Sequence, residues 1–182
     1  GPQTMAFALE LLEALVKDQF NEYTYPIAKE KGGTEIHMMW TDTPCRITCW
    51  NCGNETIIAE RDPKIEFIVA QHPWLENDCL IADVILPSNT TLEVEDVVTN
   101  TRQGPHFQSI TIQGKAMEPI GESKSDYEIV CMIAERLGLL DKVTEGRTLE
   151  EWIKYAFDTS GAKEFISYEE WKAKGYFISP TV

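Results

Sequence analysis

The segment 67–97 carries the clearest pattern of apolar and polar positions in the chain. It contains two short runs, Phe67–Ala70 and Val84–Leu86, in which apolar residues follow one another without polar residues between them. Such runs are typical of strands covered on both faces, as in a parallel sheet. Each run ends in a polar loop, at 71–74 and at 87–91. Ligands of open parallel sheets bind where such carboxyl-end loops meet, so the pattern predicts a ligand site at this edge.

The chain before and between these runs completes an alternating order of strands and helices. An apolar run at 36–40 predicts a further strand, and helical segments are predicted around 54–61 and 75–81. Strand, helix, strand, helix, strand is the order of βαβ units with right-handed crossovers. We therefore predict an α/β fold with an open, mostly parallel sheet and flanking helices. An amphipathic helix at 7–16, followed by a loop, leads into it.

The chain beyond residue 120 carries three helix-start signals. Ser125 with Glu128, Thr148 with Glu151 and Ser167 with Glu170 each have the spacing of a capping box. Gly138 predicts the end of the first of these helices, and residues 111–116 predict a further strand or extended segment. The expected organisation is a lead-in helix and loop at 1–33, an α/β domain at 34–140 and a helical extension at 141–182.

Charge and cysteine content narrow the class of protein. A formal net charge of -14 makes nucleic acid and anionic membranes poor partners. The apolar runs are too short to span a bilayer. Five cysteines, an odd number, do not suit a disulfide framework and favour reduced thiols in a cytoplasmic or anaerobic setting. The chain begins Gly-Pro-Gln, and we expect it to be a piece of a longer protein whose targeting it does not reveal.

Cys45, Cys49 and Cys52 form the most conspicuous chemical motif. Their C-x3-C-x2-C spacing resembles the cluster loop of radical S-adenosylmethionine enzymes, in which three thiolates hold a [4Fe–4S] cluster. That family usually has an aromatic residue at the position of Asn51 and builds a barrel from many more βα units than this chain offers. Ordinary thiols are therefore the favoured interpretation. Cys79 and Cys131 have apolar neighbours in the sequence and are predicted core residues.

His72, Asp83 and Asp126 are the other candidate site residues. His72 directly follows a buried strand, and we expect it to hydrogen-bond a ligand rather than to act as a general base. Asp83 adjoins an apolar strand and, if it is buried, must be hydrogen-bonded either to neighbouring backbone or to a ligand. Asp126 lies in a first helical turn, where the helix dipole favours any carboxylate. The remaining polar candidates are expected to be structural or solvated, namely His37, His106, Glu93, Glu95 and Asp96.

Several ordered motifs resemble one enzyme family. Ala82-Asp83-Val84-Ile85-Leu86-Pro87 follows Phe67-Ile68-Val69 and precedes Glu93, and Gly121-Glu122-Ser123-Lys124-Ser125-Asp126 comes later at the expected distance. This arrangement, over about residues 34 to 140, resembles the molybdopterin oxidoreductases of the dimethyl sulfoxide reductase family. The resemblance implies an α/β domain that grips one of two molybdopterin guanine dinucleotides around a molybdenum ion. No catalytic residue or metal ligand is expected in this chain.

The resemblance also assigns cofactor contacts to particular residues. The segment Trp40-Thr41-Asp42-Thr43-Pro44 matches the family's first strand-end loop, and Gln71 with His72 matches the second. His72 stands where the family usually has an acidic residue, and Val94 where Lys or Arg is common. The residues expected to bind the cofactor are Trp40, Thr41, Asp42, Thr43, Gln71, His72, Trp74, Asp83 and Asp126.

Within this family the chain resembles most the transhydroxylases, through the run 121–129, the helix carrying Trp152 and the segment 174–177. This resemblance implies an enzyme that moves a hydroxyl between phenolic rings, with a phenolic substrate and [4Fe–4S] clusters in a small partner subunit. The parent would be a cytoplasmic protein of anaerobic metabolism. The alternatives are another oxidoreductase of the family, a radical S-adenosylmethionine fragment and a non-catalytic interaction domain.

Overall fold

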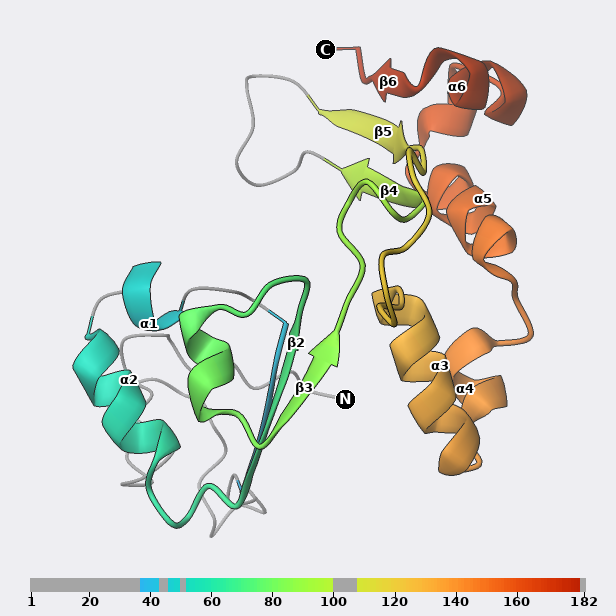
Figure 1. The fold of residues 1–182 in the computed structure, drawn as a ribbon. Helices are drawn as coiled ribbons and strands as arrows, with labels where there is room; N and C mark the ends of the chain where they lie inside the picture. Colours follow the sequence, from blue (N-terminus) through green and yellow to red (C-terminus); the bar gives the residue numbers. More distant parts are fainter. Residues whose placement is uncertain (1–36, 43–45, 50–51, 100–107, 181–182) are drawn as a thin grey trace, which may run out of the picture. The chain divides into compact units, whose positions relative to one another are not determined.

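The computed structural model describes residues 37–42, 46–49, 52–99 and 108–180, and the chain divides into two compact units, 1–87 and 88–182 (Figure 1). Each unit contains its own three-stranded sheet. The predicted helix at 7–16 lies outside the described residues, as do Thr43, Cys45 and His106.

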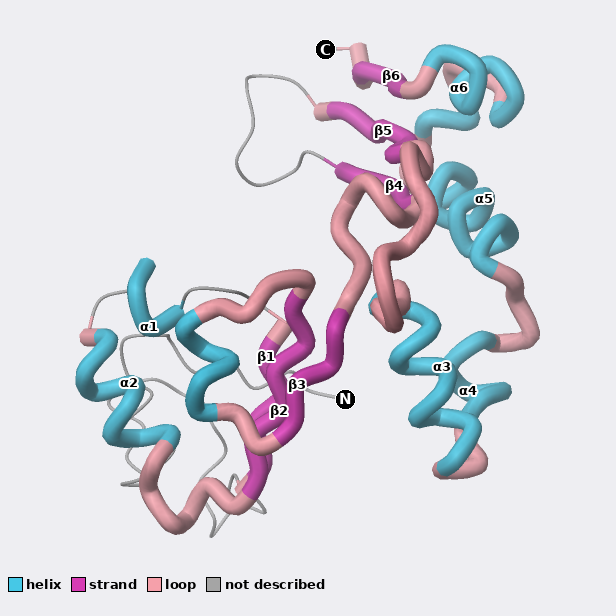
Figure 2. The backbone as a smooth tube through the Cα atoms, in the orientation of Figure 1, coloured by secondary structure: helices cyan, strands magenta, loops and turns pink. Residues whose placement is uncertain are grey.

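The first unit is built on a parallel sheet with the strand order β1-β2-β3. Trp40 pairs with Val69 across the first two strands, and Gln71 pairs with Leu86 across the second pair. The helices between the strands lie on one side of this sheet (Figure 2), as two crossovers of the same hand require. The α/β class and the open parallel sheet are therefore confirmed. The elements are β1 (Met38–Thr41), α1 (Arg46–Cys49), α2 (Gly53–Glu60), β2 (Phe67–His72), the 3-10 helix η4 (Asn77–Ile81) and β3 (Val84–Pro87).

The central strand β2 is buried on both faces, as its apolar run predicts. Ile68 and Val69 point to opposite faces and are 3% and 4% exposed. β2 continues through Gln71 and His72, so the prediction that these two residues begin a polar loop is wrong. The prediction that the run in β3 is covered on both faces is also wrong for the described residues. Val84 and Ile85 are 38% and 42% exposed because β3 pairs with β2 alone and forms an edge of the described sheet.

The second unit packs helices against an antiparallel sheet with the order β4-β5-β6. The segment predicted at 111–116 overlaps β5 at residues 111–113, whereas β4 and β6 are not anticipated by the sequence pattern. The core consists of Ile110, Ile153, Phe157, Ala162 and Trp171. The elements are β4 (Asp96–Thr99), β5 (Ser109–Gln113), α3 (Asp126–Arg136), α4 (Leu140–Thr144), α5 (Leu149–Thr159), η5 (Ala162–Glu164), α6 (Tyr168–Lys174) and β6 (Tyr176–Ile178).

This division places the boundary of the compact units at Pro87 and Ser88, inside the segment 34–140 expected as one α/β domain. The segment 141–182 contains the strand β6 in addition to helices. The role of 34–140 as the cofactor-binding part of the chain stays a prediction.

All three predicted capping boxes are present. The glutamate at the third helical position accepts a hydrogen bond from the backbone N–H of the capping residue, at 2.8 Å in α3, 2.8 Å in α5 and 3.1 Å in α6. Each capping hydroxyl accepts the reciprocal bond from the glutamate N–H. Gly138 has a φ of 68°, which a glycine adopts without strain, and it follows the end of α3 as predicted.

Candidate functional site at the carboxyl edge of the parallel sheet

The residues that end β1 and β2 lie side by side at one edge of the parallel sheet. Thr41 pairs with Ala70, so Asp42, which follows β1, lies near the level of Gln71 and His72. Side chains alternate between faces along a strand. Gln71 therefore shares a face with Trp40, and His72 shares the opposite face with Thr41. The structure thus brings together five of the residues predicted to contact a ligand.

On the first face, the indole Nε1–H of Trp40 donates a hydrogen bond to Gln71 Oε1 at 3.1 Å. Gln71 is 5% exposed and Trp40 is 41% exposed. The indole therefore fixes the orientation of a buried amide while much of its own ring faces outward. A fixed amide at a strand end can present its N–H group to a polar ligand.

On the opposite face, His72 is 1% exposed, and neither Nδ1 nor Nε2 has a hydrogen-bond partner among the described residues. A buried polar atom without a partner costs about 1–3 kcal/mol. Buried polar groups in native proteins are nearly always paired, and an exception at a strand end is a reason to look for a missing ligand. An imidazole can offer one donor and one acceptor to such a ligand.

Asp78 connects the helical segments that follow β1 and β2. It lies in η4, which follows the loop after β2, and its carboxylate Oδ1 accepts a hydrogen bond from the Ile47 N–H at 3.2 Å. Ile47 belongs to α1, which follows the loop after β1. Asp78 is fully buried. This side chain therefore joins η4 to α1, and no pattern in the sequence distinguished it from a solvated residue.

Asp83 and Trp74, which are also predicted to contact the cofactor, are not part of the group formed by the ends of β1 and β2. Asp83 precedes β3 at the amino edge of the sheet, opposite the candidate site. Its Oδ2 accepts a hydrogen bond from the Ile68 N–H at 2.7 Å, and its own N–H donates to the Ile68 carbonyl. The structure does not bring Asp83 to the other residues and gives it the role of a backbone cap. Trp74 lies two residues after the end of β2 and is 58% exposed, so its ring is accessible to a ligand.

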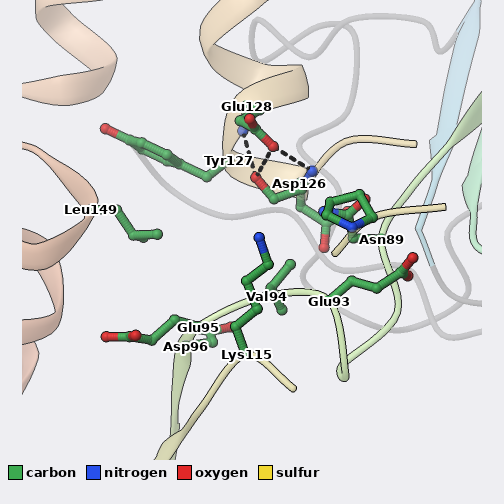
Figure 3. A pocket seen from close by; sticks show the side chains of 12 residues that line it. Asn89, Glu93, Val94, Glu95, Asp96, Lys115, Asp126, Tyr127, Glu128 and Leu149 are labelled. Carbon is green, nitrogen blue, oxygen red and sulfur yellow. Dashed lines mark hydrogen bonds between the residues drawn. The ribbon is translucent and has the colours of Figure 1, made fainter. Parts of the chain in front are cut away.

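Asp126 belongs to the second unit, where it lines a cavity of about 500 Å³ (Figure 3). The cavity combines the first turn of α3 with carboxylates from the segment before β4 and with Lys115, whose ammonium group points toward that turn. Lys115 also forms an ion pair with Glu118 at 2.7 Å. Asn89 lines the same cavity, and its Oδ1 is buried without a partner among the described residues. The surroundings of Asp126 therefore combine charged side chains and apolar surface with room for part of a ligand.

Glu93 is a structural residue of this cavity wall rather than the solvated surface group predicted from sequence. It is 5% exposed. Its Oε2 accepts hydrogen bonds from the N–H and the hydroxyl of Thr90, both at 2.7 Å, and its Oε1 accepts one from the Ile120 N–H at 2.7 Å. The Thr90 and Ile120 hydrogen bonds lower the pKa of the Glu93 carboxyl. Glu95 and Asp96 are more exposed, in agreement with the prediction.

The described cysteines and His37 lie outside the candidate site residues at the ends of β1 and β2. Cys79 is buried as predicted, and burial raises the pKa of its thiol. Cys131 is half-buried, whereas Cys49 and Cys52 are exposed. His37 precedes β1 and pairs through Nδ1 with Glu66 Oε1 at 3.1 Å, which fits the structural role expected of it. No helix in the described part of the chain is long and apolar enough to cross a membrane.

Comparison with known proteins agrees with the fold. The family model for molybdopterin oxidoreductases matches residues 13–136. The chain therefore belongs to the molybdopterin oxidoreductase family, a family of enzymes with a molybdenum–pterin cofactor. The matched range includes Cys45, Cys49 and Cys52, so the family assignment replaces the alternative of a radical S-adenosylmethionine fragment.

Individual relatives place the chain within the dimethyl sulfoxide reductase type of this family. The large subunit of pyrogallol hydroxytransferase from Pelobacter acidigallici is 28% identical over 91% of this chain and 20% of that protein. Dimethyl sulfoxide reductase DmsA from Escherichia coli is 31% identical over 82% of this chain and 19% of that protein. Acetylene hydratase from Pelobacter acetylenicus shares the fold, with a TM-score of 0.62 and 19% identity over 97% of this chain and 21% of that chain. The chain spans about a fifth of the length of these relatives.

Proposed function

We propose that this chain holds the nucleotide end of a molybdopterin guanine dinucleotide in a larger molybdenum enzyme. The observation that carries the proposal is the carboxyl edge of the parallel sheet. There His72 buries two ring nitrogens that have no partner among the described residues, and the amide of Gln71, on the opposite face, is fixed by Trp40. Family membership supplies the cofactor class, since the matched range 13–136 includes all of these residues. When bound, the molybdenum centre would supply the hydroxyl- or oxygen-transfer chemistry.

The residues present fit a nucleotide better than a metal ion. Within the described ranges no group of three His, Cys, Asp or Glu side chains is placed to hold a metal. The edge instead offers an indole, an amide, an imidazole and the carboxylate of Asp42. A purine presents alternating donors and acceptors and a flat face, so Gln71, His72 and Asp42 would hydrogen-bond its edge or ribose while Trp40 and Trp74 offer rings. Asp126 stays a predicted cofactor contact on the strength of the family resemblance alone.

For the reaction of the whole protein, we propose transfer of a hydroxyl between phenolic rings, as in the conversion of pyrogallol to phloroglucinol. The similarity to a pyrogallol hydroxytransferase over 91% of the chain supports this choice. That relative is a large subunit, which supports a small partner subunit, and we propose that this subunit carries the [4Fe–4S] clusters. The second candidate is reduction of a sulfoxide, favoured by 31% identity to dimethyl sulfoxide reductase DmsA. Cytoplasmic location stays a prediction.

Elemental and nucleotide analysis of the full-length protein tests the proposal. We expect molybdenum together with about two guanine nucleotides per metal ion after acid release, because the family resemblance implies two dinucleotides around one molybdenum. Molybdenum without guanine nucleotide would contradict the proposed form of the cofactor. The absence of both molybdenum and guanine nucleotide would contradict the proposed function. Assays of the same preparation with pyrogallol, and with a sulfoxide plus a reduced dye, separate the two candidate reactions.

A further inference from the structure

The indole of Trp40 is engaged through its nitrogen although much of the residue is exposed. Trp40 is the third residue of β1 and is 41% exposed, and its Nε1–H donates to Gln71 Oε1 at 3.1 Å. An indole has one hydrogen-bond donor and no acceptor. The amide oxygen of Gln71 is therefore the atom that faces Trp40, and the amide nitrogen is directed away from the indole nitrogen.

Gln71 combines a fixed backbone with an amide that packing alone does not orient. It lies in β2, the central strand of the parallel sheet, pairs with Leu86 and is 5% exposed. The oxygen and the NH2 group of a glutamine amide have nearly the same shape but opposite hydrogen-bonding character. A half-turn of the amide would therefore fill the same space and exchange donor for acceptor. The hydrogen bond from Trp40 selects one of these two orientations.

We propose that Trp40 is a positioning residue of the nucleotide site, which holds the Gln71 amide so that its NH2 group meets an acceptor atom of the nucleotide. This inference rests on the proposed function. Guanine O6 and N7 are acceptors of this kind, as are the oxygens of ribose and phosphate. Trp40 thus contributes to binding through its N–H and Gln71, whereas Trp74, which is 58% exposed, contributes through direct contact of its ring.

Two substitutions of Trp40 separate its N–H from its ring. In Trp40→His, the imidazole Nε2 has the same position in its five-membered ring as the indole Nε1, so the donor to Gln71 is kept while the benzene ring is lost. Trp40→Phe keeps a six-membered aromatic ring and removes the donor. At about pH 8 a histidine of ordinary pKa is neutral, so Trp40→His adds no charge.

The test measures how fast guanine nucleotide leaves the full-length, cofactor-loaded protein during dialysis at this pH. We expect Trp40→Phe to release nucleotide about two- to tenfold faster than wild type, which corresponds to the loss of one hydrogen bond, and Trp40→His to stay within about twofold of wild type. The same two substitutions at Trp74 are the matched control. We expect the opposite order there, because histidine offers a smaller ring than phenylalanine.

A Gln71→Met variant tests whether Trp40 acts through the amide. Methionine keeps the unbranched shape of the side chain and removes its amide group. In this background we expect Trp40→Phe to cause no further acceleration of nucleotide release, because the group that Trp40 orients is absent. Thermal unfolding of the cofactor-free proteins verifies that each variant is folded.

Three results would overturn the proposal. Faster release from Trp40→His than from Trp40→Phe would make Trp40 a direct ring contact. Equal acceleration by Trp40→Phe with and without the Gln71 amide would show that Trp40 does not act through Gln71. The same order of the two variants at Trp40 and Trp74 would show that the order has a cause unrelated to Gln71.

The release measurement also separates this inference from the proposed function on which it rests. If the wild-type protein holds guanine nucleotide and Trp40→Phe leaves its release unchanged, the positioning role alone fails. A wild-type protein that holds no guanine nucleotide would contradict the proposed function and the positioning role together.

Discussion

Replacing Trp171 with alanine is expected to lower the free energy of unfolding of the second unit by about 3–5 kcal/mol, the usual loss for a large aromatic side chain removed from a core. Trp171 is 0% exposed, and its ring centroid lies 5.1 Å from that of Phe157 and 5.8 Å from that of Tyr168. Its indole Nε1–H donates to the carbonyl of Ile110 in β5 at 3.0 Å. This one side chain therefore joins α6 to both the sheet and α5.

A Trp171→Phe variant separates the contribution of apolar packing from that of the indole hydrogen bond. It keeps most of the apolar contact but leaves the buried Ile110 carbonyl without the indole donor, so we expect a smaller loss of about 1–3 kcal/mol. Urea unfolding followed by circular dichroism gives both values. A loss below about 1 kcal/mol for Trp171→Ala would show that Trp171 does not organise this core.

Replacing His72 with phenylalanine is expected to act in opposite directions on the stability of the cofactor-free protein and on cofactor binding. Without ligand, the change removes two buried nitrogens that lack partners among the described residues and keeps a ring in their place. Exchanging unpaired polar atoms for apolar ones of similar shape is close to neutral or stabilising. With ligand, it removes one or two hydrogen bonds, which corresponds to about a ten- to hundredfold weaker binding.

The measurement compares thermal unfolding of cofactor-free protein with the guanine nucleotide retained by loaded protein after extended dialysis. A His72→Gln variant, which keeps a donor and an acceptor, should retain more nucleotide than His72→Phe. If His72→Phe lowers the unfolding temperature and leaves nucleotide retention unchanged, His72 is a packing residue and contributes nothing to the site.

The parts of this fold that the sequence predicts are those encoded by neighbouring residues. The capping boxes at Ser125, Thr148 and Ser167 form as predicted, because each glutamate lies three residues from its partner in any helix. The buried strand β2 is likewise predicted by its own apolar run. Here local pattern and tertiary structure agree.

The parts that the sequence does not predict depend on residues far apart in the chain. β6 has three residues and becomes a strand only because Phe177 pairs with Ile110 in β5. Asp78 and Glu93 resemble solvated acids in the sequence, yet each is buried because backbone N–H groups from other segments donate to its carboxylate. For Asp83 the sequence leaves two partners open, neighbouring backbone or a ligand, and the structure shows the backbone N–H of Ile68 donating to its carboxylate.

Within the candidate site, the sequence predicts which edge of the sheet is polar but not how its side chains are arranged. The pairing of Trp40 with Gln71 follows from the strand register, which positions Trp40 beside Val69. Continuation of β2 through His72 decides that the imidazole is buried rather than exposed in a loop. Both features require the neighbouring strand, and the periodicity of a single strand does not contain them.

Hydrogen–deuterium exchange of the full-length protein, with and without its cofactor, tests most directly whether the carboxyl edge of the parallel sheet holds the nucleotide. Cofactor-free protein is produced in a host that cannot make the molybdenum cofactor. We predict that the cofactor slows exchange in peptides covering residues 40–42 and 71–76, which contain the ends of β1 and β2 and the residues directly after them, and leaves α6 unchanged. Unchanged exchange in those two segments, with cofactor-dependent protection confined to other parts of the protein, would contradict the account.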